Sequence, residues 1–124
     1  MGKIYAMKAS KMENNGATLR KLFNILSNQY EVLECFPGTS SLQNVTAIIK
    51  VPKGPKIGIE TQGSTHSRLG ESLIKFKNKG CDIIFCTCLT SGKTVKTVKS
   101  MEPEYEVIFT EGNSADALWR MAKV

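Results

Sequence analysis

Short apolar runs alternate with segments of helical periodicity along most of this 124-residue chain, and this alternation constrains its fold more than any other feature. The apolar runs predict β-strands at residues 3–7, 31–36, 45–51, 56–60, 81–86 and 105–109. Helices are predicted after the first strand and after each of the last three. Their apolar faces are Leu19, Leu22, Phe23 and Leu26; Leu69, Leu73 and Phe76; Val95, Val98 and Met101; and Ala115, Leu118, Trp119 and Ala122.

This order of elements predicts the fold class. Strands that are each followed by a helix need right-handed crossovers, which build a parallel sheet with helices on both faces. The turn at residues 52–55 instead predicts an antiparallel hairpin between the third and fourth strands. We therefore expect one α/β domain over residues 1–124, with α/β/α layers and a mainly parallel sheet that contains one antiparallel hairpin. Helix-end signals are Ser67 and Gly80 around the second helix, and Asn113 or Ser114 before the last.

Composition limits the class of protein. Hydrophobic residues make up 41% of the chain and charged residues 23%, as in globular domains. The longest charge-free apolar run, at 83–86, is far too short to cross a bilayer, so a membrane protein is not expected. The first residues lack the apolar stretch of a secretory signal, which predicts a cytoplasmic protein with reduced cysteines. The four cysteines lie in or beside apolar runs, so no structural metal site is expected.

The chain is basic, with 17 Lys and Arg against 11 Asp and Glu and a formal net charge of +6. This excess is spread over both halves of the sequence. It suits a phosphorylated ligand or another polyanion, but a solvated lysine-rich surface is the commoner explanation of such an excess. Aromatic residues fall on apolar faces rather than between basic residues, which does not indicate a stacking platform for single strands. Because the charge alone suits a polyanion, a nucleic-acid partner stays an alternative, although the aromatic residues do not favour it.

The carboxyl ends of the parallel strands are where an open α/β sheet binds its ligand. The loops expected there are 8–18, 61–67, 87–94 and 110–114, and all of them are rich in glycine, hydroxyl and amide residues. Such loops present backbone N–H groups at helix N-termini, which can hold a phosphate. The alternative is that they are ordinary turns, in which the same residues are common.

The first of these loops carries the most specific pattern. A strand, a loop and an amphipathic helix opened by residues 15–22 stand where a phosphate-binding loop would be. Gly16 and Thr18 match the second glycine and the final hydroxyl of G-x-x-x-x-G-K-[ST], whereas Lys11 replaces the first glycine and Ala17 the lysine. The chain thus resembles a P-loop NTPase with a degenerate Walker A motif. The resemblance implies that Lys11, Asn15, Gly16 and Thr18 contact phosphate and that Thr18 reaches Mg²⁺. Lys8 is another source of the missing positive charge, and a plain turn with a helix cap is the alternative.

Residues 57–63 extend this resemblance, because an apolar strand ends in Glu60 and a glycine follows three residues later. The segment is similar to the Walker B strand of GTPase-like P-loop proteins, with glutamate in place of aspartate. The resemblance implies that Glu60 is an acid beside Mg²⁺ or one that orients water, with Gln62 and Gly63 near the terminal phosphate. The alternative is an exposed glutamate at the end of a strand.

A third segment, residues 90–94, lies after the fifth strand. Ser91, Gly92, Lys93 and Thr94 start a helix there and can bind an anion, and Lys93 can supply the charge missing at Ala17. The alternative is that Lys93, Lys96 and Lys99 form a solvated helical row.

These patterns lead to two hypotheses about function. Their combination is similar to small bacterial or phage ATP-binding proteins of P-loop type, and it predicts a protein that binds a nucleotide or another phosphorylated small molecule. The expected cofactor is Mg²⁺ with ATP or GTP, and NTPase activity stays open because the Walker A lysine is missing. The second hypothesis is a non-catalytic regulatory protein that uses this fold to bind a protein or nucleic-acid partner. A homo-oligomer that completes the site, and chemistry at His66 or Cys88, are further alternatives.

Overall fold

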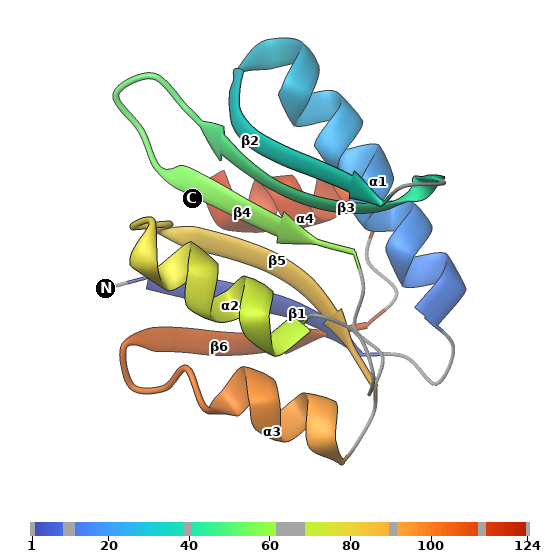
Figure 1. Cartoon of the computed structure of the whole chain (residues 1–124), viewed down its shortest axis with the longest axis vertical. Coiled ribbons are helices and arrows are strands. Elements are labelled where there is room, and N and C mark those ends of the chain that lie inside the picture. The colour runs from blue at the N-terminus through green and yellow to red at the C-terminus, as the bar shows by residue number, and fades with distance from the viewer. Residues whose placement is uncertain are drawn as a thin grey trace.

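The computed structural model describes residues 2–8, 12–38, 41–61, 69–89, 92–111 and 114–123. Its strands and helices follow the predicted order (Figure 1). They are β1 (Gly2–Lys8), α1 (Met12–Gln29), β2 (Glu31–Gly38), β3 (Ser41–Lys50), β4 (Lys56–Glu60), α2 (Leu69–Asn78), β5 (Ile83–Cys88), α3 (Lys93–Lys99), β6 (Tyr105–Thr110) and α4 (Ala115–Lys123). Within the described residues, no helix is both long and apolar enough to cross a membrane.

The sheet is mixed, which corrects the expectation of a mainly parallel sheet. Its strand order is β2-β3-β4-β5-β1-β6. Neighbours among β4, β5, β1 and β6 pair in parallel, whereas β3 pairs antiparallel with both β2 and β4. Because no helix separates β2, β3 and β4, each pairs with the next as an antiparallel neighbour. The third strand was predicted over 45–51, but β3 already begins at Ser41.

The predicted hairpin at residues 52–55 is confirmed. It joins β3 to β4 in antiparallel register, with Ile49 opposite Ile57. The Val51 N–H donates to Pro55 O at 3.1 Å, and the Gly54 N–H donates to Val51 O at 2.9 Å. These bonds close the turn, and they fix the register in which β4 pairs with β3.

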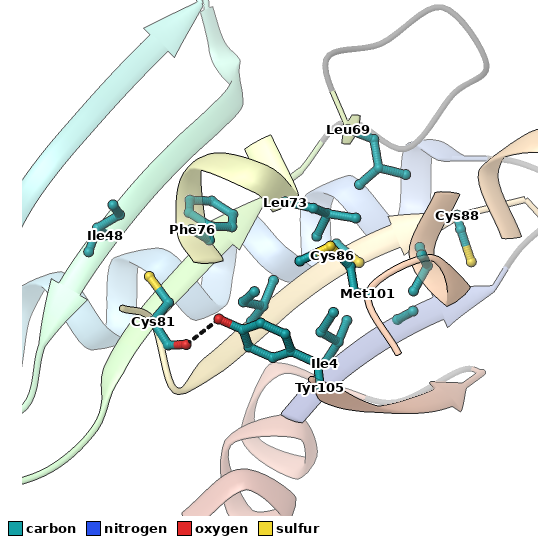
Figure 2. Packing of buried hydrophobic residues seen from close by; sticks show 13 residues of the cluster. Ile4, Ile48, Leu69, Leu73, Phe76, Cys81, Cys86, Cys88, Met101 and Tyr105 are labelled. Atoms are coloured by element: carbon teal, nitrogen blue, oxygen red, sulfur yellow. Dashed lines mark hydrogen bonds between the residues drawn. The ribbon is translucent and has the colours of Figure 1, made fainter. Parts of the chain in front are cut away.

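Helices cover both faces of the sheet, so the three layers are as predicted. α1 and α4 cover one face, the α1–α4 face, in a buried cluster that includes Tyr5, Met7, Leu19, Leu22, Leu26, Phe85, Ala115 and Leu118. α2 and α3 cover the other face, the α2–α3 face, in a cluster that includes Ile4, Ala6, Leu69, Leu73, Phe76, Cys86, Val98 and Met101 (Figure 2). Successive residues of β1 enter different clusters because neighbouring side chains of a strand point to opposite faces.

Local signals mark the end of α2 and the start of α4 where the sequence predicts them. Gly80 follows α2 with a φ of 77°, in the left-handed region that glycine adopts without strain. The Gly80 N–H donates to Lys77 O at 3.0 Å and the Cys81 N–H to Phe76 O at 2.9 Å, which is the Schellman pattern. At the start of α4, Ser114 Oγ accepts a hydrogen bond of 3.1 Å from the Ala117 N–H. The predicted cap at Ser67 lies outside the described residues.

A glycine in β4 lets α2 approach the sheet. A Cβ added to Gly58 would lie 2.6 Å from Cγ of Phe76, which is far closer than carbon atoms can pack. Phe76 is completely buried. The absence of a side chain at Gly58 is therefore what allows the Phe76 ring to lie over β4 and bring α2 into place.

This contact predicts the effect of Gly58→Ala. The added methyl group must displace the Phe76 ring inside a packed core, which should lower the free energy of unfolding by about 1–3 kcal/mol. Urea denaturation at neutral pH measures the change.

Gly16→Ala is the matched control, because a Cβ at Gly16 meets its nearest neighbours only at 3.5 Å and 3.6 Å. Gly16 lies inside α1, where alanine is favoured over glycine, so this variant should be more stable by about 0.5–1 kcal/mol. A Gly58→Ala variant as stable as the original chain would contradict the described packing of Phe76.

Candidate functional site

The chain leaves two neighbouring parallel strands, β1 and β5, towards opposite faces of the sheet. After β1 it enters α1 on the α1–α4 face, and after β5 it enters α3 on the α2–α3 face. The strands pair directly, with Met7 beside Thr87 and Lys8 beside Cys88. Figure 1 shows the first turns of both helices at the edge where these strands end. In open α/β sheets, ligands bind beyond the strand ends at such a switch point.

Threonines at or just after the ends of three strands, β4, β5 and β6, lie in a row across this edge of the sheet. Thr87 of β5 and Thr110 of β6 are both register partners of Met7, which packs on the α1–α4 face. Thr61 follows β4, and its carbonyl accepts a hydrogen bond of 3.3 Å from Thr87 Oγ1. All three threonines of this row are buried. The row therefore places polar groups at the switch point, where the sequence alone indicated only the starts of loops.

Thr110 has the one feature of this row that points to a ligand. Its side chain is buried at 8% exposure, and its Oγ1 has no hydrogen-bond partner among the described residues. A buried hydroxyl left without a partner costs about 1–3 kcal/mol, and such groups are rare in native proteins. A ligand that exchanges a hydrogen bond with Thr110 at the switch point would remove this cost.

The structure corrects the start of α1 on which the P-loop interpretation depends. The helix begins at Met12, so Gly16 lies inside it rather than at its opening. N–H groups beyond the first turn donate to helix carbonyls, and those of Gly16 and Thr18 are therefore already used. Gly16 instead packs against the end of β4, where a Cβ would lie 3.6 Å from Thr61 O. The N–H groups that remain for an anion are those of the first turn, from Met12 onwards.

Glu60 is completely buried at the end of β4. The alternative that it is an exposed glutamate at the end of a strand is therefore wrong. Its Oε1 accepts a hydrogen bond of 2.7 Å from Thr46 Oγ1 and one of 2.5 Å from Ser72 Oγ. Thr46 belongs to β3 and Ser72 to α2. The carboxylate therefore ties two strands to the helix on the α2–α3 face.

This arrangement argues against direct coordination of Mg²⁺ by Glu60 together with Thr18. Magnesium keeps several waters in a near-octahedral shell, which a completely buried carboxylate cannot accommodate. Glu60 also faces α2, whereas Thr18 belongs to α1 on the opposite face. Among the described residues, no group of at least three His, Cys, Asp or Glu side chains is placed to hold a metal ion.

Lys8 places a positive charge at the end of β1, on the α2–α3 face of the sheet and therefore on the other face from the threonine row. It is the last residue of β1, and its Nζ lies 4.3 Å from the centre of the Phe109 ring, a cation–π distance. Its register partner Cys88 is buried, and burial raises the pKa of the Cys88 thiol to about 11 although the Lys8 charge lowers it. Burial also raises the pKa of Cys86 well above its ordinary value. These thiols are protonated at neutral pH, which disfavours the alternative of a nucleophilic cysteine.

These pKa values predict the pattern of thiol labelling. In the native protein at pH 7.5 a disulfide reagent should react with one thiol, the exposed Cys35. Cys81, Cys86 and Cys88 are buried and should react only after denaturation. A chromogenic disulfide reagent with and without guanidinium measures both counts.

Cys35→Ser is the control for this experiment and should abolish labelling of the native protein. Fast native labelling that persists in Cys35→Ser and disappears in Cys88→Ser would contradict the described burial and restore Cys88 as a candidate nucleophile.

The segment before α3 has a different role from the one expected. Gly92 precedes the helix with a φ of 89°, which favours glycine, and Thr94 Oγ1 accepts a hydrogen bond of 2.9 Å from the Leu89 N–H. Thr94 is buried, so its hydroxyl holds the connection between β5 and α3. Lys93 lines a groove between α2 and α3. The structure therefore does not bring Lys93 to Gly16, which packs on the other face of the sheet.

Several predicted site residues cannot be placed. Lys11, Gln62, Gly63, His66 and Ser91 lie outside the described residues, and only the backbone of Asn15 is described. The threonine row, in turn, was not predicted as a site from the sequence. Its signal is visible in the sequence, because Thr61, Thr87 and Thr110 each come at or just after the end of an apolar strand.

Comparison with protein-family models, curated proteins and solved structures gives no match for this chain. The resemblance to P-loop proteins therefore depends on the residues quoted above and on no relative.

Proposed function

We propose that this chain binds a nucleotide or another phosphorylated small molecule at the switch point between β1 and β5. The observation that carries the proposal is the departure of α1 and α3 to opposite faces from these paired strands. The unpartnered hydroxyl of Thr110 supports it, because that group lies in the row that crosses the same strand ends.

The groups that surround this position favour an anionic ligand. The first turn of α1 contributes backbone N–H groups, and the Lys8 ammonium group lies at the same strand end, over Phe109 on the other face of the sheet. Only residues 9–11 separate Lys8 from α1, so the helix start lies within about 14 Å of the end of β1. The net charge of +6 adds attraction at longer range. A phosphate group matches these donors better than a neutral ligand does.

The residues at this position favour binding of the nucleotide without its hydrolysis. Ala17 is exposed on α1 and supplies no charge where a Walker A motif has lysine. Glu60 is held by two hydroxyl groups inside the protein, which does not suit a residue that orients an attacking water. We propose Mg²⁺ only as an ion that accompanies the phosphates of the ligand.

Ligand binding should raise the thermal stability of the protein, because a ligand that binds only the folded state stabilises it by RT ln(1 + [L]/Kd). We expect millimolar ATP or GTP to raise the unfolding temperature, and Thr110→Val to reduce this rise. Valine has the shape of threonine without the hydroxyl, so the free variant should be at least as stable as the original chain. Differential scanning fluorimetry with and without Mg²⁺ measures these changes.

Thr110→Ser is the matched control, because it keeps the hydroxyl and should keep the stabilisation by ligand. The proposal is wrong if neither nucleotides nor inorganic phosphate stabilise the original chain. An equal shift in Thr110→Val would show that a ligand binds elsewhere.

A further inference from the structure

A groove of about 530 Å³ runs between α2 and α3 on the face of the sheet opposite α1. Its lining residues are Gly70, Leu73, Ile74, Lys93, Lys96, Thr97, Ser100 and Met101. Leu73 and Met101 are buried beneath it. The groove is open to solvent and combines an apolar base with two basic side chains, and it lies on the other face from the threonine row.

The lysines of α2 and α3 differ in whether a carboxylate neutralises them. Lys77 of α2 forms an ion pair of 2.7 Å with Glu104, a residue of the turn that follows α3. Lys93 and Lys96 of α3 are exposed, and neither forms an ion pair with any described residue. The groove therefore presents positive charge that no described carboxylate neutralises.

The positions of these two lysines are unfavourable for α3 itself. Lys93 is the first residue of the helix, where the macrodipole favours an acidic residue, and the first turn contains none. Lys93 and Lys96 are also three positions apart, a spacing at which like charges repel each other on a helix. Residues that break such local rules are often found at functional sites.

Ile74 adds an apolar contact to the same groove. Its side chain is 57% exposed, more than any other large hydrophobic residue that the structure describes. A single exposed isoleucine is ordinary in a folded protein. Here it borders a groove that has both a buried apolar base and two lysines without an ion-pair partner among the described residues, so apolar and positively charged contacts lie side by side.

We propose that the α2–α3 groove binds an acidic peptide segment of a partner protein. An apolar side chain of the segment occupies the groove against Leu73 and Ile74, and carboxylates on either side of it pair with Lys93 and Lys96. Complementary charge and an apolar anchor are the features by which open grooves recognise peptides. This proposal does not depend on the ligand at the switch point.

The composition of the groove favours a peptide over the other two classes of ligand. Nucleic acid would satisfy the lysines, but no aromatic side chain in the lining can stack on a base. A small molecule would be poorly enclosed, because pockets for such ligands usually bury 70–90% or more of the ligand. A peptide needs only one enclosed side chain and complementary charge along its edges.

Selection from a phage-displayed library of random dodecapeptides tests the proposal on the full chain. We expect enriched peptides with an aliphatic or aromatic residue flanked by Asp or Glu. Synthetic versions, measured by fluorescence anisotropy, should bind the Lys93→Glu/Lys96→Glu double variant at least about tenfold more weakly, because repulsion replaces two attractions. Ile74→Ala should weaken binding by about threefold or more.

Lys99→Glu is the control for position, since it reverses the charge of an exposed lysine of α3 that does not line the groove, with half the change of charge of the double variant. It should bind the peptides like the original chain, apart from a small effect of net charge. All exchanged side chains are exposed, so the unfolding temperatures of the variants should stay close to that of the original chain.

Three outcomes would overturn the proposal. The first is a selection that enriches no acidic peptide with an apolar residue. The second is enriched peptides that bind the double variant and the original chain equally. The third is that oligo(dT) binds the chain through Lys93 and Lys96 whereas no peptide does. That result would assign the groove to nucleic acid.

Discussion

The parallel pairing of β1 with β5 is the constraint on which the rest of this structure depends. Both strands are buried on both faces, and the helices that follow them leave towards opposite sides. That divergence brings the end of β1, the end of β5 and the start of α1 to one edge of the sheet (Figure 1). The candidate site is therefore a consequence of topology, and the residues at the strand ends decide its chemistry.

The two faces of the sheet use their polar residues differently at this edge. On the α2–α3 face, Glu60 is satisfied by Thr46 and Ser72 and stabilises the junction of two strands with a helix. On the α1–α4 face, Thr110 keeps a buried hydroxyl without a partner among the described residues. The glutamate that most resembled a catalytic residue in the sequence thus has a structural explanation, whereas the inconspicuous threonine does not. This contrast is why we assign ligand binding to the threonine row and the first turn of α1.

Apolar periodicity was enough to predict the order of the elements, but not the pairing of every strand or the residues of the site. The strand over 56–60 and the helix end at Gly80 have strong local signals, and both are confirmed. The start of α1 was missed because residues 12–15 lack an apolar pattern that would extend the helix. The burial of Glu60 was also not predictable, because its hydroxyl partners lie 12 and 14 positions away in the sequence. Such long-range contacts leave no periodic signal.

Residue-by-residue NMR tests the central claim most directly, because backbone amide shifts report where a ligand binds. In a titration of the ¹⁵N-labelled chain with ATP, our account predicts saturable shifts at the amides of Lys8, Thr87 and Thr110 and in the first turn of α1. The residues of the α2–α3 groove should not shift beyond what their distance from the ligand explains. Shifts confined to α3, or none at the ends of β1 and β5, would contradict a ligand site at the switch point.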